Sequence, residues 1–153
     1  MRAGALQIRK ATTHDLSQVV VCARLAYSKY VDRIGKIPAP MSADFFHQIK
    51  KGIVFVAQQE SKFAGYVVFY PAGRNHLHLE NIAVLPEMSR QGIGKALIKY
   101  AEHVAQQAGL KAVELYTNEA MAENLSMYPK LGYVEIGRER QDGFNRVFFR
   151  KKL

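Results

Sequence analysis

The sequence has little cysteine and no long apolar run, and each absence excludes a class of protein. A single cysteine, Cys22, cannot close an intramolecular disulfide, and without a second cysteine a cysteine-based zinc site is excluded as well. Strictly apolar runs such as Val19 to Ala23 are far shorter than the roughly 18 residues of a membrane span. The opening residues MRAGALQIRK contain no apolar signal core. We therefore expect a soluble, cytoplasmic protein that has no membrane partner.

Acidic residues are also few, with 13 Asp and Glu against 22 Lys and Arg, so the net charge is +9. This excess favours a polyanionic partner such as nucleic acid, a membrane surface or a phosphorylated cofactor. The basic residues are scattered except for one cluster, whose spacing is typical of a strand pair: Arg138, Arg140, Arg146, Arg150, Lys151 and Lys152. A solvated basic edge explains this cluster better than a nucleic-acid patch, because no recognition-helix motif or aromatic-interleaved basic run is present. We expect no nucleic-acid partner.

No internal repeat, low-complexity block or linker rich in Ser, Gly or Pro divides the chain. A chain of 153 residues is long enough for one domain with a sizeable core and too short for two of ordinary size. Hydrophobic residues make up 48% of it and charged residues 23%, which argues against a disordered or collagen-like chain. We expect a single domain over residues 1–153.

The first third of the chain predicts one strand and two helices. Thr12 and Asp15 have the spacing of a capping box at the start of a helix, and apolar residues then recur at helical spacing as far as Ile34. The expected elements are a short strand around Leu6 and Ile8, a helix from Leu16 to Ile34, and a shorter helix that Ser42 caps and Gly52 ends.

Beyond Gly52 the apolar period changes from helical to alternating, which predicts three consecutive antiparallel strands and then further helices and strands. The expected elements are strands over 53–59, 63–70 and 76–85, a helix over 92–109, a strand over 112–116, a helix over about 119–131, and strands over 133–137 and 144–149 joined by a turn at Asp142-Gly143. The order β-α-α-β-β-β-α-β-α-β-β predicts the α/β class, a mixed sheet with helices over its faces.

A glycine turn, SRQGIG, leads from the third of these strands into the helix. Gly92 and Gly94 leave backbone amides open at the helix start, and these amides together with the helix dipole form an anion site. A P-loop is excluded because Ser89 stands at the position of its first glycine and Ala96 at the position of its Ser or Thr. A dinucleotide fingerprint is excluded because Leu97 replaces its third small residue and the preceding strands are antiparallel.

The turn resembles the acyl-CoA-binding turn of the GNAT superfamily of N-acetyltransferases, whose pattern is Arg or Gln, two residues, Gly, one residue, then Gly or Ala. Ser89 departs from the first position, and Arg90 beside it could supply a neighbouring charge. Three blocks that look like GNAT sequence follow one another in the family's order: LENIAVLPEMSRQGIGKALI, ELYTNEAMAENLSMYPKLGYVEIGR and DGFNRVFFRKKL. The resemblance covers essentially the whole chain and implies the GNAT acyltransferase fold, with acetyl-CoA as cosubstrate.

The resemblance also implies which residues bind the cosubstrate. Those that contact the pantetheine are Ile82, Ala83, Val84 and Asn124, and those around the pyrophosphate are Arg90, Gln91, Gly92, Gly94, Lys95 and Ala96. A strongly anionic cosubstrate would account for part of the positive charge.

Acetyl transfer from a thioester to an amine requires a base for the amine and a proton for the departing thiolate. Alternation along the third of the three strands places these residues on one face: His76, His78, Glu80, Ile82 and Val84. Members of the family often use a Glu on this strand as the base. By resemblance, Glu80 is the base or orients a water, and His78 assists. The alternative is that Glu80 only pairs with a basic neighbour and that the histidines lie on a solvated surface.

Tyr128 stands ahead of a Lys-Leu-Gly-aromatic turn, where the family carries the tyrosine that protonates the CoA sulfur. A phenol suits this role because its reference pKa of about 10 keeps it protonated at neutral pH. The alternative for Tyr128 is an aromatic residue of the core.

The acceptor site of the family lies under the first-helix region and varies with the substrate. By resemblance, Tyr27, Tyr30, Met41 and Phe45 contact the acceptor, a small-molecule amine or a peptide amine. No histidine has metal-ligand spacing, so we expect no metal. Two alternatives remain: a non-catalytic CoA-binding module with a sensor or protein-interaction role, and an acetyltransferase for protein N-termini or lysines.

The oligomeric state stays open at this point. The family often forms dimers, and the last two strands contain an apolar segment, Val147 to Phe149, which could pair across a homodimer interface or face the core.

Overall fold

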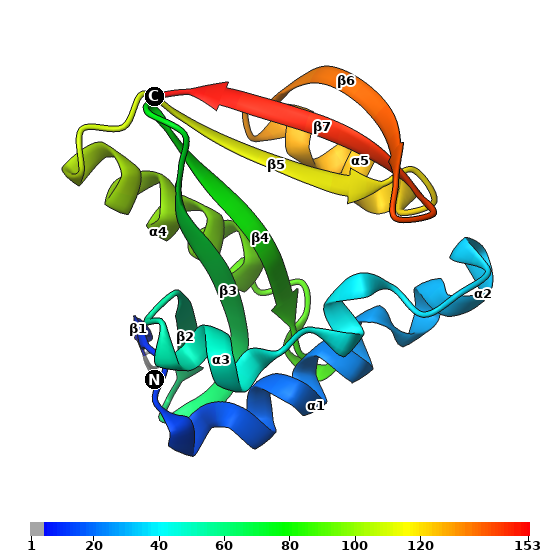
Figure 1. The fold of residues 1–153 in the computed structure, drawn as a ribbon. Coiled ribbons are helices and arrows are strands. Elements are labelled where there is room, and N and C mark those ends of the chain that lie inside the picture. Colours follow the sequence, from blue (N-terminus) through cyan, green and yellow to red (C-terminus); the bar gives the residue numbers. More distant parts are fainter. Residues whose placement is uncertain (1–4) are drawn as a thin grey trace.

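The computed structural model describes residues 5–153, and within them seven strands form one mixed sheet in the order β1-β2-β3-β4-β5-β7-β6 (Figure 1). The first four residues of the opening segment MRAGALQIRK lie outside the described residues. The strands are β1 Leu6–Lys10, β2 Val54–Gln59, β3 Lys62–Ala72, β4 His76–Val84, β5 Ala112–Asn118, β6 Val134–Gln141 and β7 Phe144–Lys152. Neighbouring strands run antiparallel except β4 and β5, which are parallel. The expected α/β class and mixed sheet are confirmed.

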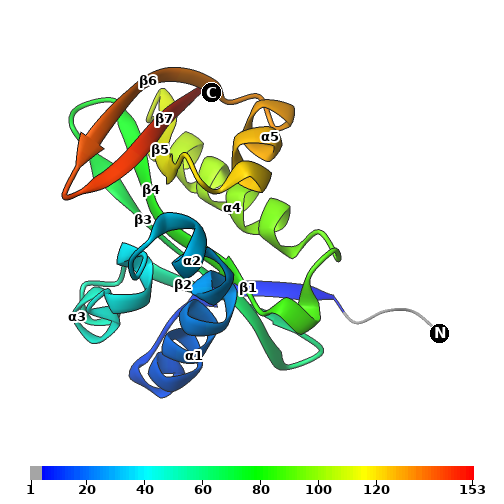
Figure 2. The ribbon, with the colours of Figure 1, turned by 90° about the vertical axis from the view of Figure 1, so that its right-hand side faces the viewer.

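Helices cover both faces of the sheet (Figure 2). They are α1 Leu16–Tyr27, α2 Val31–Ile34, α3 Phe45–Lys50, α4 Ile93–Gln107 and α5 Ala122–Lys130, with short 3-10 turns at Thr13–Asp15, Ser28–Tyr30, Ala39–Ser42 and Pro86–Met88. The buried stripe of α4 and residues of α5 form one core with the sheet, and α1 and α3 form a second core on the opposite face. The sheet therefore separates two apolar layers.

Strands β4 and β5 pair over only part of their length. Their register runs from His76 opposite Ala112 to Leu79 opposite Leu115, after which the two strands diverge (Figure 1). The remainder of β4, as far as Val84, pairs with β3 alone. The divergence leaves an opening in the middle of the sheet.

Strand β4 carries a β-bulge just after its pairing with β5 ends. In its pairing with β3, Val68 lies opposite Asn81 and Phe69 lies opposite Leu79, so Glu80 is an extra residue on β4. Because side chains alternate along a strand, one extra residue reverses the faces of all that follow.

The bulge shows that the expected sharing of one face by His76, His78, Glu80, Ile82 and Val84 is wrong. Leu79 and Ile82 both pack into the core of α4 and α5, although they are three positions apart and regular alternation would separate them. Ile82 and Val84 therefore belong to the α4 side of the sheet, whereas His78 and Glu80 point to the opposite side. A pattern of side-chain types cannot reveal a bulge, because the period on each side of it is still two.

Two local expectations need correction, and a third is confirmed. The helix expected from Leu16 to Ile34 is divided by a 3-10 turn at Ser28–Tyr30 and ends at Gly35, whose φ is +84°. The second short helix is capped by Asp44, which accepts a hydrogen bond from the His47 amide at 3.1 Å, and not by Ser42. The capping box at Thr12 and Asp15 is confirmed, with the Thr12 amide 2.8 Å from the Asp15 carboxylate.

The basic cluster between Arg138 and Lys152 is only in part a solvated edge. Arg138 is exposed on the edge strand β6, but the side chain of Arg146 is only 10% exposed. The apolar residues Val147 and Phe149 are buried in the core of α4 and α5. Of the two expectations for this segment, a dimer interface or the core, these two residues therefore follow the second.

Candidate active site

A pocket opens where β4 and β5 diverge, and we call it the Glu80 pocket. It measures about 580 Å³, its open mouth included. Four segments line it: Leu79–Ile82 of β4, Tyr116–Asn118 of β5, Met121, Asn124 and Tyr128 at α5, and Phe144 and Arg146 of β7; Tyr27, Ile34 and Pro38–Pro40 close its other side. The bulge turns Glu80 toward this pocket.

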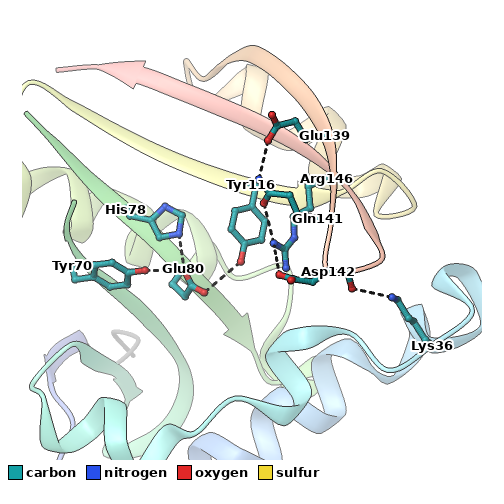
Figure 3. Close-up of polar contacts among 9 residues, drawn as sticks. All are labelled: Lys36, Tyr70, His78, Glu80, Tyr116, Glu139, Gln141, Asp142 and Arg146. Carbon is teal, nitrogen blue, oxygen red and sulfur yellow. Dashed lines mark hydrogen bonds and ion pairs between the residues drawn. The ribbon is translucent and has the colours of Figure 1, made fainter. Parts of the chain in front are cut away.

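Glu80 lies at the centre of a polar cluster. Its Oε2 is 2.6 Å from His78 Nε2 and accepts a hydrogen bond from the Tyr70 hydroxyl at 3.2 Å, and its Oε1 accepts one from the Tyr116 hydroxyl at 3.4 Å (Figure 3). The hydrogen bond with His78 holds the pKa of Glu80 below its usual value, although burial opposes this. Burial, with Glu80 as neighbour, raises the pKa of Tyr70 to about 12. The cluster thus combines an ionised carboxylate with three neighbours that can donate hydrogen bonds.

A second depression, which we call the α4 groove, lies beyond the end of β4. Its lining comes from β4 at Ile82, Ala83 and Val84, from the start of α4 at Ser89, Gly94 and Ile98, from α5 at Asn124, Met127 and Tyr128, and from the α1 end at Leu25–Tyr27, Lys29 and Tyr30. The predicted pantetheine-binding residues therefore come together in one groove. Of the residues predicted near the pyrophosphate, Gly94 lines it, whereas Arg90, Gln91, Gly92 and Lys95 are exposed beside it and Ala96 is half-buried.

The first turn of α4 presents backbone amides at one end of this groove. The Ala96 amide makes the first intrahelical hydrogen bond, to the Gly92 carbonyl at 3.0 Å, so the amides of the three preceding residues start the helix without such a partner. Gly92 adopts a φ of +77°, a conformation that glycine tolerates best. Arg90 also has a positive φ, +64°, which tightens the turn before the helix.

Four residues line both the Glu80 pocket and the α4 groove: Tyr27, Ile82, Asn124 and Tyr128. The Tyr27 hydroxyl donates to the Ile82 carbonyl at 2.7 Å, which ties α1 to β4 between the two depressions. Asn124 Nδ2 donates to Thr117 Oγ1 at 3.1 Å and so joins α5 to β5. The described residues offer the Tyr128 hydroxyl no hydrogen-bond partner, and burial raises its pKa above the usual value. Tyr128 is thus a protonated phenol at the junction.

The structure brings two of the four predicted acceptor residues to these depressions. Tyr27 lies at the junction, and Tyr30 lines the α4 groove, where its hydroxyl donates to Glu123 at 3.1 Å. Phe45 instead packs edge-on against Tyr66 in the core of α1 and α3, at a centroid distance of 5.4 Å, and Met41 packs at the margin of the same core. Neither of these two lines the Glu80 pocket.

Other lining residues were not predicted from the sequence. Pro38 and Pro40 form one wall of the pocket, and Tyr116, Phe144 and Arg146 form another. The sequence favours a solvated basic edge for Arg146 and not a place in a pocket. Alternation in β7 places Arg146 on the face opposite the buried Val147, and this was the available signal for its position.

The fold and the two depressions can be compared with known proteins. The sequence model of the Acetyltransferase (GNAT) family matches residues 24–133, which is most of the chain. The chain belongs to this family. A curated relative, the uncharacterized N-acetyltransferase YvbK of Bacillus subtilis strain 168, is 27% identical over 85 residues, which are 56% of this chain and 55% of the relative. The chain thus spans about half of the length of that GNAT relative.

Solved structures of the same fold include PaiA N-acetyltransferase from Thermoplasma acidophilum in complex with coenzyme A, with a TM-score of 0.80 and 21% identity over 97% of this chain and 99% of that one. The ribosomal-protein-S18-alanine N-acetyltransferase from Escherichia coli has a TM-score of 0.72 and 19% identity, over 97% and 94% of the two chains. Identities this low show the GNAT fold alone.

Within residues 5–153, His, Cys, Asp and Glu side chains form no group of three or more that could hold a metal ion. None of the helices in this range combines the length and the apolar character that a membrane crossing requires.

Proposed function

We propose that this GNAT protein transfers an acetyl group from acetyl-CoA to a primary amine by direct attack, with the amine in the Glu80 pocket and the thioester in the α4 groove. The observation that carries the proposal is the junction of the two depressions, where Tyr128 lines both and Glu80 opens into one. Two reactants bound on either side of this junction would meet between a carboxylate and a phenol. This is the pair of groups that amine acetylation requires.

The chain's residues would bind acetyl-CoA along the α4 groove. The backbone of β4 at Ile82–Val84, which does not pair with β5, would hold the pantetheine, and the free amides at the start of α4 would receive the pyrophosphate. Arg90 and Lys95, exposed on either side of Gly92, add positive charge near this end. The net charge of +9 favours the approach of such an anionic substrate.

The His78–Glu80 pair would serve as the base. An ionised Glu80 fixes the imidazole by accepting the hydrogen bond from Nε2, and the pair takes the proton that the acceptor amine loses, directly or through a water. The amine nitrogen forms the bond to the thioester carbonyl carbon, and the carbon–sulfur bond breaks. Tyr128 would then donate its proton to the departing thiolate, so that CoA leaves as the thiol and the amide remains.

The size of the pocket favours a small amine or the free end of a chain as the acceptor. The space inside it that is open to water molecules is small, about 60 Å³, and admits a small group more readily than a bulky one. A terminal amine of a peptide would reach Glu80 only if the chain entered past Pro38 and Phe144 at the wall of the pocket.

Ligand-dependent unfolding tests the proposal first. Excess acetyl-CoA should raise the unfolding midpoint, dephospho-CoA should raise it less, and ADP should have the smallest effect. Release of free thiol over a panel of small amines and N-terminal peptides then measures turnover. A midpoint shift without turnover on any amine would favour the non-catalytic CoA-binding alternative, whereas turnover on peptides alone would favour the protein acetyltransferase.

A further inference from the structure

Arg146 projects from β7 toward the Glu80 pocket and is held there by aromatic rings. Its guanidinium carbon lies 4.2 Å from the ring centroid of Tyr116 and 5.7 Å from that of Phe144. The side chain is only 10% exposed, and it belongs to the pocket lining. A cation in this position loses most of its hydration, and the ring faces compensate only in part.

The polar partners of Arg146 occupy one end of its guanidinium. Nη1 donates to Gln141 Oε1 at 3.1 Å and lies 3.5 Å from Asp142 Oδ2, whose side chain is 83% exposed. Gln141 in turn donates to Glu139 at 2.8 Å, which fixes the amide that holds Nη1 (Figure 3). For Nε and Nη2 the described residues provide no hydrogen-bond partner. Two donors of the planar fork are therefore left for another acceptor.

The lining of the Glu80 pocket carries one negative and one positive side chain. Among the described residues that line it, only Glu80 and Arg146 carry a full charge, one of each sign. Tyr116 separates them: its hydroxyl contacts Glu80, and its ring lies against Arg146. The remaining lining is apolar or neutral. Such a pocket matches a ligand that has a cationic amine at one end and an anionic group about one aromatic ring away.

We infer that the acceptor is an amine that also carries a carboxylate, as a free amino acid does, and that Arg146 binds this carboxylate through Nε and Nη2. The inference rests on the proposed function and adds the class of acceptor to it. A planar carboxylate fits the two parallel donors of an arginine better than a tetrahedral anion or a neutral amide does. Apolar side chains would lie against Leu79 and Phe144.

Matched acceptors test the inference without a prior identification of the substrate. Leucine, methionine and phenylalanine are each compared with their carboxamides and with the corresponding decarboxylated amines, and kcat/KM is measured by thiol release. Phosphoserine and aminoethyl phosphate, which we call the phosphate arm, test whether the site prefers a phosphate group to a carboxylate. We expect at least one amino acid to exceed both neutral counterparts by about tenfold or more, because these leave the two donors unpaired.

Variants of Arg146 then show whether this residue causes the preference for amino acids over their carboxamides. R146Q should lower the acid-to-carboxamide ratio of kcat/KM about tenfold or more, and R146K should restore part of it, since it keeps the charge but not the fork. R138Q, which removes an exposed arginine of the same hairpin, is the matched control and should keep the ratio. Unfolding midpoints of all three identify loss of fold. Calorimetric binding of N-acetylated amino acids to the wild type and to R146Q gives a readout independent of turnover.

The outcomes separate the two proposals. Equal rates for acids and carboxamides, or an R146Q effect of the same size on both, would overturn the carboxylate site while leaving acetyl transfer intact. A preference for the phosphate arm would also overturn it. If no amine is acetylated, acetyl transfer fails, and the carboxylate site stands only if N-acetylated amino acids bind the wild type and bind R146Q about tenfold more weakly.

Discussion

His78 Nε2 and Glu80 Oε2 lie 2.6 Å apart, at the bulge where β4 leaves β5. The two residues are only two positions apart in the chain, so the strand itself sets their separation, and their geometry does not depend on a mobile loop. A second His–carboxylate pair, His76 with Glu114 at 3.6 Å, lies at the other end of the parallel register and does not line the pocket. The molecule thus contains its own control for the proposed catalytic pair.

Removal of the base should slow turnover while leaving the binding of acetyl-CoA in place. We expect Glu80→Gln and His78→Ala to lower kcat by about 10²-fold or more, the usual contribution of a general base. His76→Ala is the matched control, and its kcat should stay within about twofold of the wild type, because its carboxylate partner Glu114 does not line the pocket, whereas Glu80 does. Steady-state kinetics with the best acceptor measure these values. Near-normal rates for both site variants would remove the pair from the mechanism.

The pKa of Glu80 should depend on His78. The hydrogen bond from His78 is the largest cause of its lowered pKa, and burial acts in the opposite direction. His78→Ala removes the lowering contribution and leaves the burial, so the pKa of Glu80 should rise. Carbon-13 NMR titration of labelled glutamate side chains, assigned with Glu80→Gln, measures the change. A pKa that stays constant or falls would contradict the contact.

Tyr128→Phe should lower kcat about 10²-fold or more, with little change in the affinity for acetyl-CoA, because only the proton donor is lost. Tyr133→Phe is the matched control. It removes the hydroxyl that donates to Glu102 at 2.8 Å, in the same core but outside both depressions, so it should lower stability and not kcat. Pre-steady-state rates together with calorimetric titration of acetyl-CoA separate the two effects. A Tyr128→Phe enzyme with wild-type kcat would exclude the phenol as the acid.

The two glycines of the turn should respond differently to alanine. Gly92→Ala places a side chain at a φ of +77°, which costs about 1–2 kcal/mol of stability although no atom lies within 4 Å of the new Cβ. Gly94→Ala has a Cβ 3.7 Å from Val84 Cγ2, an ordinary contact, so the fold should tolerate it. The turn pattern of the family has Gly or Ala at this position, so affinity for acetyl-CoA should stay close to that of the wild type. Chemical denaturation and ligand titration of both variants test this contrast; a Gly94→Ala protein that no longer binds acetyl-CoA would contradict the placement.

Stability near the N-terminal helix should depend on pH through Asp15. Two hydrogen bonds from Arg9, at 2.8 and 2.9 Å, are the largest cause of the lowered pKa of Asp15. A lowered folded-state pKa stabilises the fold above the unfolded pKa of about 3.9, and this contribution is lost as the pH falls through the folded pKa. Asp15→Asn should therefore cost about 2 kcal/mol at pH 7 and progressively less below pH 4.

Urea denaturation of the wild type and Asp15→Asn at several pH values measures this difference. Glu135→Gln, which breaks the exposed ion pair with Arg138, is the control and should have little effect at any pH. A cost for Asp15→Asn that does not change between pH 7 and pH 3 would show that the carboxylate charge contributes nothing.

Much of the architecture could be predicted from the sequence, because the order of elements and the ends of α4 depend on apolar periodicity and on glycine. The side chains that face the site could not be predicted as well. The bulge at Glu80 leaves the local period unchanged and reverses the faces of Ile82 and Val84. Phe45 lies in a core, although the Pro38–Pro40 segment that precedes it lines the pocket. Alternation in β7 indicates the face of Arg146, but its place beside Tyr116 depends on pairing with β5, a strand about thirty residues away in sequence.

Glu80, the extra residue in β4, is not needed for the pairing of the sheet. If Glu80 were deleted, Leu79, Asn81 and Ile82 would follow one another with regular alternation, and each would keep the face it has now. The sheet can thus be completed without this residue. A chain that lacks Glu80 should unfold at a temperature close to that of Glu80→Ala, and a much lower midpoint would contradict this view. Glu80 is then the one residue that interrupts the regular alternation of β4. Its side chain is also the carboxylate that lines the pocket.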